Sequence, residues 1–247
     1  MRIIGVIPAR WASTRLPGKS LIPLCGKPLV QWVAERASRA RKLDGLLVAT
    51  DDERIRKAVT QCGFQAVMTR ADHRSGTERA AEAVAGRGAE VVINIQGDEP
   101  LIDPALIDAV AEMMAGNCDM ATAAAPIEGE SDTENPSIVK VVWDRDGYAL
   151  YFSRSVIPCV RDRDSRPGAP LHWRHIGIYG YRQAFLDRFV AAPPCAIEEA
   201  EKLEQLRALY IGGRIRVIQT RYAGIGVDTP ADVVAAEAAI REAGLAP

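Results

Sequence analysis

The sequence predicts an α/β protein with a mostly parallel sheet and helices on both of its faces. The strands expected at 2–7 and 91–95 are continuous apolar runs, which is typical of strands that a parallel sheet buries on both sides. Strand and helix also alternate three times within the first hundred residues, as expected for a doubly wound fold. A chain of 247 residues fits one large domain that includes a smaller lobe.

Local signals define the elements of the first half. Pro28 suits the first turn of a helix expected over about 28–40. Asp51 can cap a second helix that ends near Gln61, before a glycine. The remaining elements of this half are strands at 46–50 and 65–68 and a helix at 76–84.

The second half changes character. Strands expected at 120–126, 137–143 and 148–153 are joined by turns, notably Asp144-Arg145-Asp146-Gly147, which predicts antiparallel pairing. The charged stretch 161–170 is expected to be a mobile surface loop. Further on, the pattern predicts a strand at 175–181, an amphipathic helix at 197–210, a strand at 216–220 and a helix that begins at Thr229-Pro230.

Composition excludes several classes of protein. The 31 Lys and Arg residues balance the 32 Asp and Glu residues. The chain therefore lacks the basic excess that is typical of proteins that bind nucleic acids. No apolar run approaches the ~18 residues of a membrane span, and the first residues do not resemble an export signal. Five separated cysteines and three histidines form no zinc pattern and suggest reduced thiols. These observations predict a cytoplasmic protein without a membrane or nucleic-acid partner.

The loop after the first strand has the composition of a phosphate cradle. Residues 8–19 combine three cations, Arg10, Arg15 and Lys19, with hydroxyl groups and a glycine. A triphosphate needs such directional donors, although a solvated basic loop is the alternative. The loop matches neither the Walker A pattern nor a G-x-G-x-x-G turn, which disfavours P-loop enzymes and dehydrogenases.

Carboxylates follow the strand at 91–95, at the same expected edge of the sheet. Asp98 and Glu99 would repel phosphates unless a hard cation lay between them, which indicates a Mg²⁺ site. Asp228 could complete the site, or it could simply cap the last helix. The loop at 72–79 could present Thr77 and backbone amides to a nucleoside, although Ser-Gly-Thr-Glu is also a good helix cap.

Seven motifs resemble those of one family. They are I-P-A-R-x-A-S-T-R-L-P-G-K at 7–19, M-T-R-A-D-H-x-S-G-T-E-R at 68–79, N-I-Q-G-D-E-P at 94–100, G-Y-A-L-Y-F-S-R at 147–154, R-H-I-G-I-Y-G-Y-R at 174–182, L-E-Q-L-R at 203–207 and G-V-D-T-P at 226–230. Together they closely resemble the 3-deoxy-manno-octulosonate cytidylyltransferases. The related CMP-sialic acid synthetases share the first pattern but are not expected to carry the blocks at 148–154 and 175–181.

The resemblance implies roles for individual residues. The implied nucleotide-binding residues are Pro8, Ala9, Arg10, Ser13, Arg15, Lys19, Arg74, Ser75, Gly76 and Thr77. The implied sugar-binding residues are Gln96, Arg154, His175, Tyr179, Glu204 and Gln205, although His175 could also be a buried structural histidine. Asp98 and Asp228 would hold Mg²⁺, and with Lys19 and Arg10 they form the implied catalytic set. Trp11 and Arg74 depart from the Tyr and Gln expected there.

The resemblance also implies a fold and an activity. The fold is the Rossmann-like type of nucleotide-diphospho-sugar transferases, with a nucleotide-binding core at 1–118 and 211–247 and a sugar-binding part at about 119–210. A smaller antiparallel sub-lobe of the latter would form a homodimer. The implied cytoplasmic enzyme transfers CMP from CTP to 3-deoxy-D-manno-octulosonate (Kdo) for lipopolysaccharide synthesis.

Other functions remain open at this stage. A related sugar acid, such as 8-amino-Kdo or sialic acid, could replace Kdo. A metal-dependent glycosyltransferase would use a D-x-D motif, which occurs at 144–146 and 162–164 but in turn-like or loop contexts. A non-catalytic nucleotide sensor would need the phosphate loop without the paired carboxylates.

Overall fold

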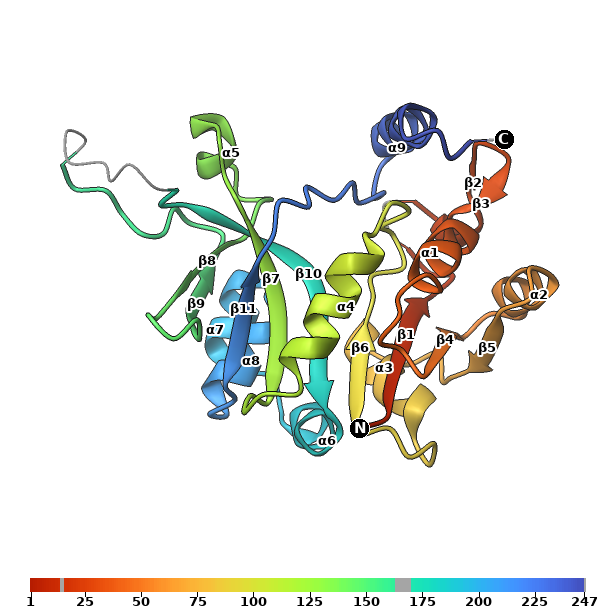
Figure 1. Cartoon of the computed structure of the whole chain (residues 1–247), viewed down its shortest axis with the longest axis horizontal. Helices are drawn as coiled ribbons and strands as arrows, with labels where there is room; N and C mark the ends of the chain where they lie inside the picture. Colours follow the sequence, from red (N-terminus) through yellow and green to blue (C-terminus); the bar gives the residue numbers. More distant parts are fainter. Residues whose placement is uncertain (14–15, 163–169, 247) are drawn as a thin grey trace.

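The computed structural model describes residues 1–13, 16–162 and 170–246 (Figure 1). Within these residues a nine-stranded sheet forms the centre, and seven of its strands follow the order β11-β7-β10-β6-β1-β4-β5. The bounds are β1 (Ile3–Ala9), β4 (Gly45–Thr50), β5 (Gln65–Met68), β6 (Val91–Asn94), β7 (Met120–Pro126), β10 (Trp173–Arg182) and β11 (Ile215–Gln219). Only β10 runs antiparallel to its neighbours in this path, so the prediction of a mostly parallel sheet is confirmed.

The expected antiparallel part is a hairpin joined to this sheet. Strands β8 (Lys140–Trp143) and β9 (Ala149–Ser153) pair with each other, and β8 touches β10 at Arg174. The segment 119–210 also supplies β7 and β10 to the main sheet. A separate two-stranded sheet is formed by β2 (Pro23–Leu24) and β3 (Lys27–Pro28), near the helix α9 (Pro230–Glu242) in Figure 1.

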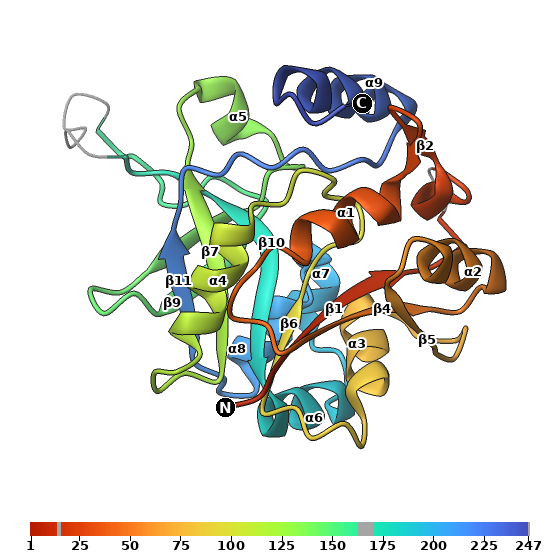
Figure 2. The ribbon, with the colours of Figure 1, turned by 45° about the vertical axis from the view of Figure 1, so that its right-hand side comes forward.

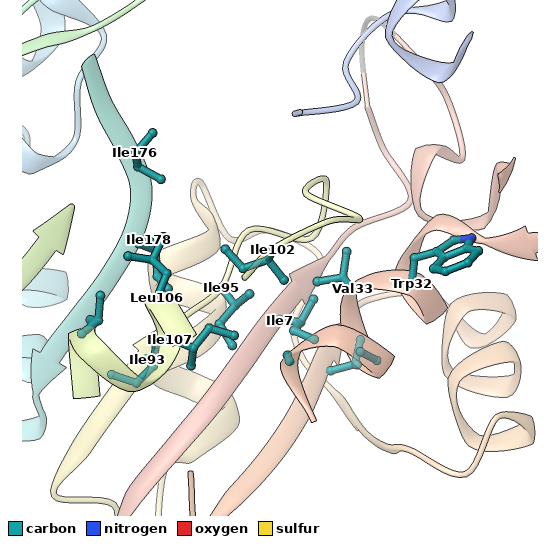
Figure 3. Packing of buried hydrophobic residues seen from close by; sticks show 14 of the residues in the cluster. Ile7, Trp32, Val33, Ile93, Ile95, Ile102, Leu106, Ile107, Ile176 and Ile178 are labelled. Carbon is teal, nitrogen blue, oxygen red and sulfur yellow. The ribbon is translucent and has the colours of Figure 1, made fainter. Parts of the chain in front are cut away.

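Helices cover both faces of the sheet, as Figure 2 shows. Buried residues of α1 (Leu29–Ala37), α2 (Glu53–Gln61), α4 (Pro104–Met113) and α9 belong to one hydrophobic cluster. Residues of α3 (Gly76–Val84), α6 (Gln183–Ala191) and α8 (Gln205–Tyr210) belong to another. Alternation along β1 separates the two clusters, because Ile7 packs in the first and Val6 in the second. Figure 3 shows Ile7 with Ile95 and with Val33 of α1.

Several boundaries correct the sequence-based predictions. The helix expected over 28–40 ends at Ala37, and the strand expected from 137 begins at Lys140. Asp52, and not Asp51, caps α2 by accepting a hydrogen bond from the Arg54 amide. The helices α4 and α6 were not predicted, although Asp103 before Pro104 is a start signal for α4. The short helices η1 (Lys19–Leu21) and α5 (Glu130–Glu134) were also missed.

The single helix expected at 197–210 is two helices, α7 (Ala196–Glu201) and α8. Lys202 ends α7 in a left-handed conformation with a φ of 52°. Amphipathic spacing continues across this break, so periodicity alone could not reveal it. The break places Glu204 and Gln205 at the beginning of α8.

Among the described residues, no helix is both long and apolar enough to cross a bilayer. Arg15, Arg163 and Asp164 lie outside the described residues. The structure therefore does not test the phosphate-binding role predicted for Arg15, the D-x-D motif at 162–164 or the surface loop expected at 161–170.

Candidate active site

A polar cavity of about 320 Å³ lies beyond the carboxyl ends of β1 and β6. This is the position at which open α/β sheets bind ligands. The predicted nucleotide residues that line it are Pro8, Arg10, Ser13, Lys19, Arg74, Ser75 and Gly76. Ala9 is instead buried in β1, and Thr77 lines a neighbouring cavity. The lining also includes His73 and Arg79, two residues of the motif at 68–79 for which no role was predicted.

Asp51 anchors the start of the phosphate loop. Its carboxylate accepts hydrogen bonds from the Trp11 amide at 3.2 Å and from the Arg79 guanidinium at 3.0 Å. Arg79 is only 2% exposed, so this ion pair is shielded from water. The Arg54 guanidinium lies 3.3 Å from the centroid of the Trp11 ring. Asp51 therefore connects the phosphate loop to helix α3.

Two glycines allow the close approach of chain segments at this edge. Gly18 has a φ of 69°, and a Cβ there would lie 2.9 Å from the Trp11 ring. A Cβ on Gly97 would collide with the Pro8 carbonyl oxygen. Without side chains at these positions, the loop can fold over Trp11 and the segment after β6 can lie against β1.

The Lys19 ammonium lies between two carboxylates from distant parts of the chain. Its Nζ is 2.7 Å from Asp98 Oδ2 and 2.9 Å from Asp228 Oδ1. Burial lowers the pKa of Lys19, but the charges and hydrogen bonds of Asp98 and Asp228 outweigh this effect, so the pKa is raised. Lys19 therefore stays protonated and neutralises part of the acidic pair.

Asp228 does not cap the last helix, which excludes the alternative role considered for it. Thr229 is the cap of α9, and it forms a capping box with Asp232. The Val227 amide donates to the Asp98 carbonyl oxygen at 2.9 Å, which holds the two acidic segments together. Asp228 is thus placed beside Asp98 by the connection between the two segments.

The donor chemistry of Asp98 and Asp228 fits Mg²⁺. Both are oxygen ligands, and they already converge on one cation, the Lys19 ammonium. In the part of the chain that the structure describes, no group of three or more His, Cys, Asp or Glu could hold a metal. Proteins commonly bind Mg²⁺ through one or two carboxylates, while substrate phosphates and water complete the shell. Such a site requires the nucleotide to supply ligands.

Glu99, the other acidic residue after β6, has a separate environment. Burial raises its pKa to about 7, and the Tyr222 hydroxyl donates a hydrogen bond to it at 3.0 Å. It does not line the phosphate cavity. Of the two carboxylates in the motif, only Asp98 therefore faces the expected nucleotide.

A second cavity, also of about 320 Å³, adjoins the first and shares Gly76 and Gln96 with it. The predicted sugar-binding residues that line it are Gln96, His175, Tyr179, Glu204 and Gln205. Arg154 does not line it, because its guanidinium donates to the carbonyl oxygens of Glu201 and Pro136. Val139, Gly177, Lys202 and Leu203 line the cavity but were not predicted. The only sequence signal for Lys202 is its position directly before the L-E-Q-L-R motif.

A bulge in β10 brings two of these residues together. The register against β7 pairs Ile176 with Ala123 and then Tyr179 with Thr122, so two residues of β10 are unpaired. In a regular strand, residues four apart are about 13 Å apart. The ring centroids of His175 and Tyr179 are instead separated by 5.4 Å. The bulge therefore places both rings next to each other at the second cavity.

A buried network connects the two cavities. The Thr77 hydroxyl donates to Glu204 at 2.6 Å, and Arg207 binds Glu204 at 3.2 Å and Glu198 at 2.9 Å. Burial raises the pKa of Glu204, against the effect of its hydrogen bonds to Thr77 and Ser75 and of the Arg207 charge. No local sequence pattern indicates this role of Arg207. Thr77 belongs to the first turn of α3 and Glu204 directly precedes α8. The network therefore joins these two helices where they line the second cavity.

A doubly wound sheet with a cationic and acidic cavity beyond its strand ends is typical of nucleotide-binding α/β proteins. Comparison with known proteins is consistent with this class, since the family model described as "Cytidylyltransferase" matches residues 4–215. The chain belongs to the 3-deoxy-manno-octulosonate cytidylyltransferase family.

Two curated relatives and one solved structure support this assignment. The 3-deoxy-manno-octulosonate cytidylyltransferase of Geobacter sulfurreducens is 50% identical over 242 residues, with 94% of this chain and 97% of that protein covered. The enzyme of the same name from Pelobacter propionicus is 47% identical, with 98% of each chain covered. A structure of CMP:2-keto-3-deoxy-manno-octonic acid synthetase complexed with CTP superposes with a TM-score of 0.93 at 39% identity, with 98% of this chain and 100% of that chain covered.

Proposed function

We propose that this protein transfers CMP from CTP to the anomeric hydroxyl of Kdo and releases diphosphate. The observation that supports this function is the pair of adjoining cavities that share Gly76 and Gln96. One cavity combines the cations and carboxylates suited to a nucleoside triphosphate, and the other carries polar groups suited to a sugar acid. A sugar in the second cavity would thus lie next to the phosphates in the first.

The chain's own cations would hold the phosphates. Arg10, Lys19 and Arg74 border the first cavity, and the first turn of α3 adds backbone amides beside Gly76. The oxygen of the Kdo hydroxyl attacks the α-phosphorus while the bond to the departing diphosphate breaks. Such a transfer is catalysed mainly by positioning and by neutralising charge on the phosphoryl oxygens. Arg15, in the same loop as Arg10 and Lys19, would add a further positive charge for the phosphates.

Asp98 and Asp228 would hold Mg²⁺ when the nucleotide supplies the remaining ligands. The ion would supply positive charge that stabilises the phosphates and favours ionisation of the attacking hydroxyl. Lys19, which already contacts both carboxylates, would keep the acidic pair partly neutral and close to the phosphates. The proton of the hydroxyl would leave to solvent.

The other candidate functions have less support. The Asp144 carboxylate accepts hydrogen bonds from the backbone amides of Asp146 and Tyr148 and so stabilises a turn. This D-x-D motif does not line either cavity. A sensor without catalysis would not need two carboxylates beside the phosphate loop. The names of the relatives favour Kdo over 8-amino-Kdo and sialic acid as the sugar.

The proposal extends to assembly and location. The family resemblance suggests a homodimer formed through the β8–β9 hairpin, where Leu150 is exposed. It also suggests a cytoplasmic enzyme that serves lipopolysaccharide synthesis.

Diphosphate release from CTP with Mg²⁺ tests the activity. Parallel reactions contain Kdo, 8-amino-Kdo, N-acetylneuraminic acid or no sugar, and we expect rapid release with Kdo. Release only with another sugar acid would overturn the assignment of the second cavity. Binding of CTP by calorimetry without release in any reaction would favour the sensor.

A further inference from the structure

The Thr122 hydroxyl lies at the centre of the β10 bulge and makes three polar contacts. It is 2.8 Å from the Ile178 carbonyl oxygen, 3.2 Å from the Ile176 carbonyl oxygen and 2.9 Å from His175 Nε2. Thr122 itself is fully buried in β7. The bulge leaves Ile178 out of the pairing with β7, so the hydroxyl supplies its carbonyl oxygen with a hydrogen bond that this pairing does not.

The hydrogen-bond donors and acceptors in these contacts determine the tautomer of His175. A threonine hydroxyl has one hydrogen to donate, and carbonyl oxygens can only accept. The hydrogen of Thr122 must therefore go to the carbonyl oxygens, because otherwise buried acceptors would face each other without a proton between them. The Thr122 oxygen is then an acceptor toward His175, and His175 Nε2 must carry a hydrogen.

The other ring nitrogen is consequently the acceptor of a neutral ring. Burial lowers the pKa of His175 to about 3, so the imidazole is uncharged at neutral pH. Nδ1 makes no hydrogen bond with any residue that the structure describes, whereas His175 lines the second cavity. The edge of the Phe152 ring, 5.0 Å away between centroids, helps to fix the plane of the imidazole.

We propose that Thr122 is a positioning residue that locks His175 in the neutral Nε2–H tautomer, so that Nδ1 accepts a hydrogen bond from a hydroxyl of the sugar acid. This inference rests on the proposed function, because it assigns a ligand hydroxyl to the second cavity. It also means that His175 selects a hydroxyl donor and does not provide a positive charge for the sugar carboxylate. Thr122 reaches the substrate only through His175.

The first test measures the tautomer in the free protein. Long-range ¹H–¹⁵N correlation spectra of ¹⁵N-histidine-labelled protein at pH 7 distinguish the two neutral tautomers and the cation. The spectrum of the His175→Gln variant identifies the His175 signals among those of the three histidines. We expect Nε2–H in the wild type and loss of that single tautomer in Thr122→Val, while Thr122→Ser retains it. An Nδ1–H or cationic His175 in the wild type would overturn the inference.

The second test separates positioning from general damage. In Thr122→Val, the KM for Kdo should rise about tenfold, while kcat and the KM for CTP change less than about twofold. Thr122→Ser should restore the KM for Kdo. Val217, which is paired with Thr122 in β11, supplies the control, because Val217→Ala loosens the same region without removing the hydroxyl.

The outcomes of the two tests are distinguishable. An unchanged tautomer and KM in Thr122→Val, or an equal rise of KM in Val217→Ala, would overturn the inference. If Thr122→Val does not fold, the wild-type spectrum still decides, because only Nε2–H agrees with the inference. An enzyme without Kdo-dependent release but with the expected spectrum would overturn the proposed function alone.

Discussion

The Lys19 ammonium is shared by two carboxylates that are separated by 130 positions in the chain, Asp98 and Asp228. Two carboxylates this close would repel each other, and the shared cation offsets that repulsion. Both are partly exposed at the cavity, so their loss should affect the fold much less than the chemistry.

Asp98→Asn should lower turnover by a factor on the order of 10² to 10⁴, because the amide cannot supply the negative oxygen that the proposed Mg²⁺ site requires. Diphosphate release measures turnover, and circular dichroism checks the fold. Asp146→Asn is the matched control, since this carboxylate is 67% exposed in a turn. Near-normal Mg²⁺-dependent turnover of Asp98→Asn would contradict the proposed mechanism.

Protonation of His175 should make stability depend on pH. Its pKa is about 3 in the folded protein and near 6.5 when exposed, so the unfolded chain gains a proton first as the pH falls. The resulting stabilisation is complete above pH 6.5 and is lost as the pH falls toward 3. Urea unfolding of His175→Gln should therefore show a shallower loss of stability between about pH 6.5 and 4 than the wild type.

The comparison needs a second histidine variant. His172→Gln should retain the wild-type slope, because His172 is partly exposed to solvent and lies outside the contact between His175 and Thr122. Equal slopes in the wild type and His175→Gln would show that His175 does not remain neutral on folding.

At the scale of elements, the break between α7 and α8 determines the sugar-facing wall. Arg207 of α8 is buried and binds Glu198 of α7, Glu204 and the Ala192 carbonyl oxygen. Its guanidinium also lies over the Phe189 ring of α6, 4.6 Å from the centroid. One planar guanidinium therefore joins three helical segments. A lysine ammonium cannot reproduce these contacts, because it lacks the planar set of donors.

Arg207→Lys should destabilise the protein by about 2 kcal/mol, because the ammonium leaves part of a buried hydrogen-bond network unpaired. It should also raise the KM for Kdo, since Glu204 loses its orientation. Urea unfolding and initial rates measure the two effects. Arg241→Ala removes an exposed pair with Glu237 and should cost at most about 0.5 kcal/mol. An equal cost for both variants would contradict the role of the network.

At the scale of the whole molecule, the β8–β9 hairpin offers a candidate surface for self-association. The register pairs Trp143 with Ala149 and Val142 with Tyr151, so Leu150 is the extra residue of a bulge and is 61% exposed. Phe152 of the same hairpin is buried in the core and does not contribute to this surface.

Leu150→Lys should weaken the proposed homodimer, because it places a charge in an apolar interface. Sedimentation equilibrium at micromolar concentration would then show a shift from dimer toward monomer. Val234→Lys is the matched control, because Val234 is 69% exposed on α9 and lies outside the hairpin. A wild type that is monomeric under these conditions would refute the dimer itself.

The sequence by itself determined the local features of this protein. Apolar runs, caps and turn residues indicated most strands and helices, and the motifs located Lys19, Asp98 and Asp228 at one sheet edge. Such signals depend on residues close in the chain, so they can be read without the fold. The family could also be predicted, because its motifs extend from residue 7 to 230.

Tertiary structure alone decided how distant segments meet. It inserted β10 antiparallel between β6 and β7, turned Arg154 away from the second cavity and placed Thr122 against His175, 53 positions further along the chain. The bulge that makes this contact arises from the pairing of two strands, and Arg207 acquires its role from the packing of helices. No local pattern contains this information, because hydrogen-bond partners that are far apart in the chain are chosen by packing.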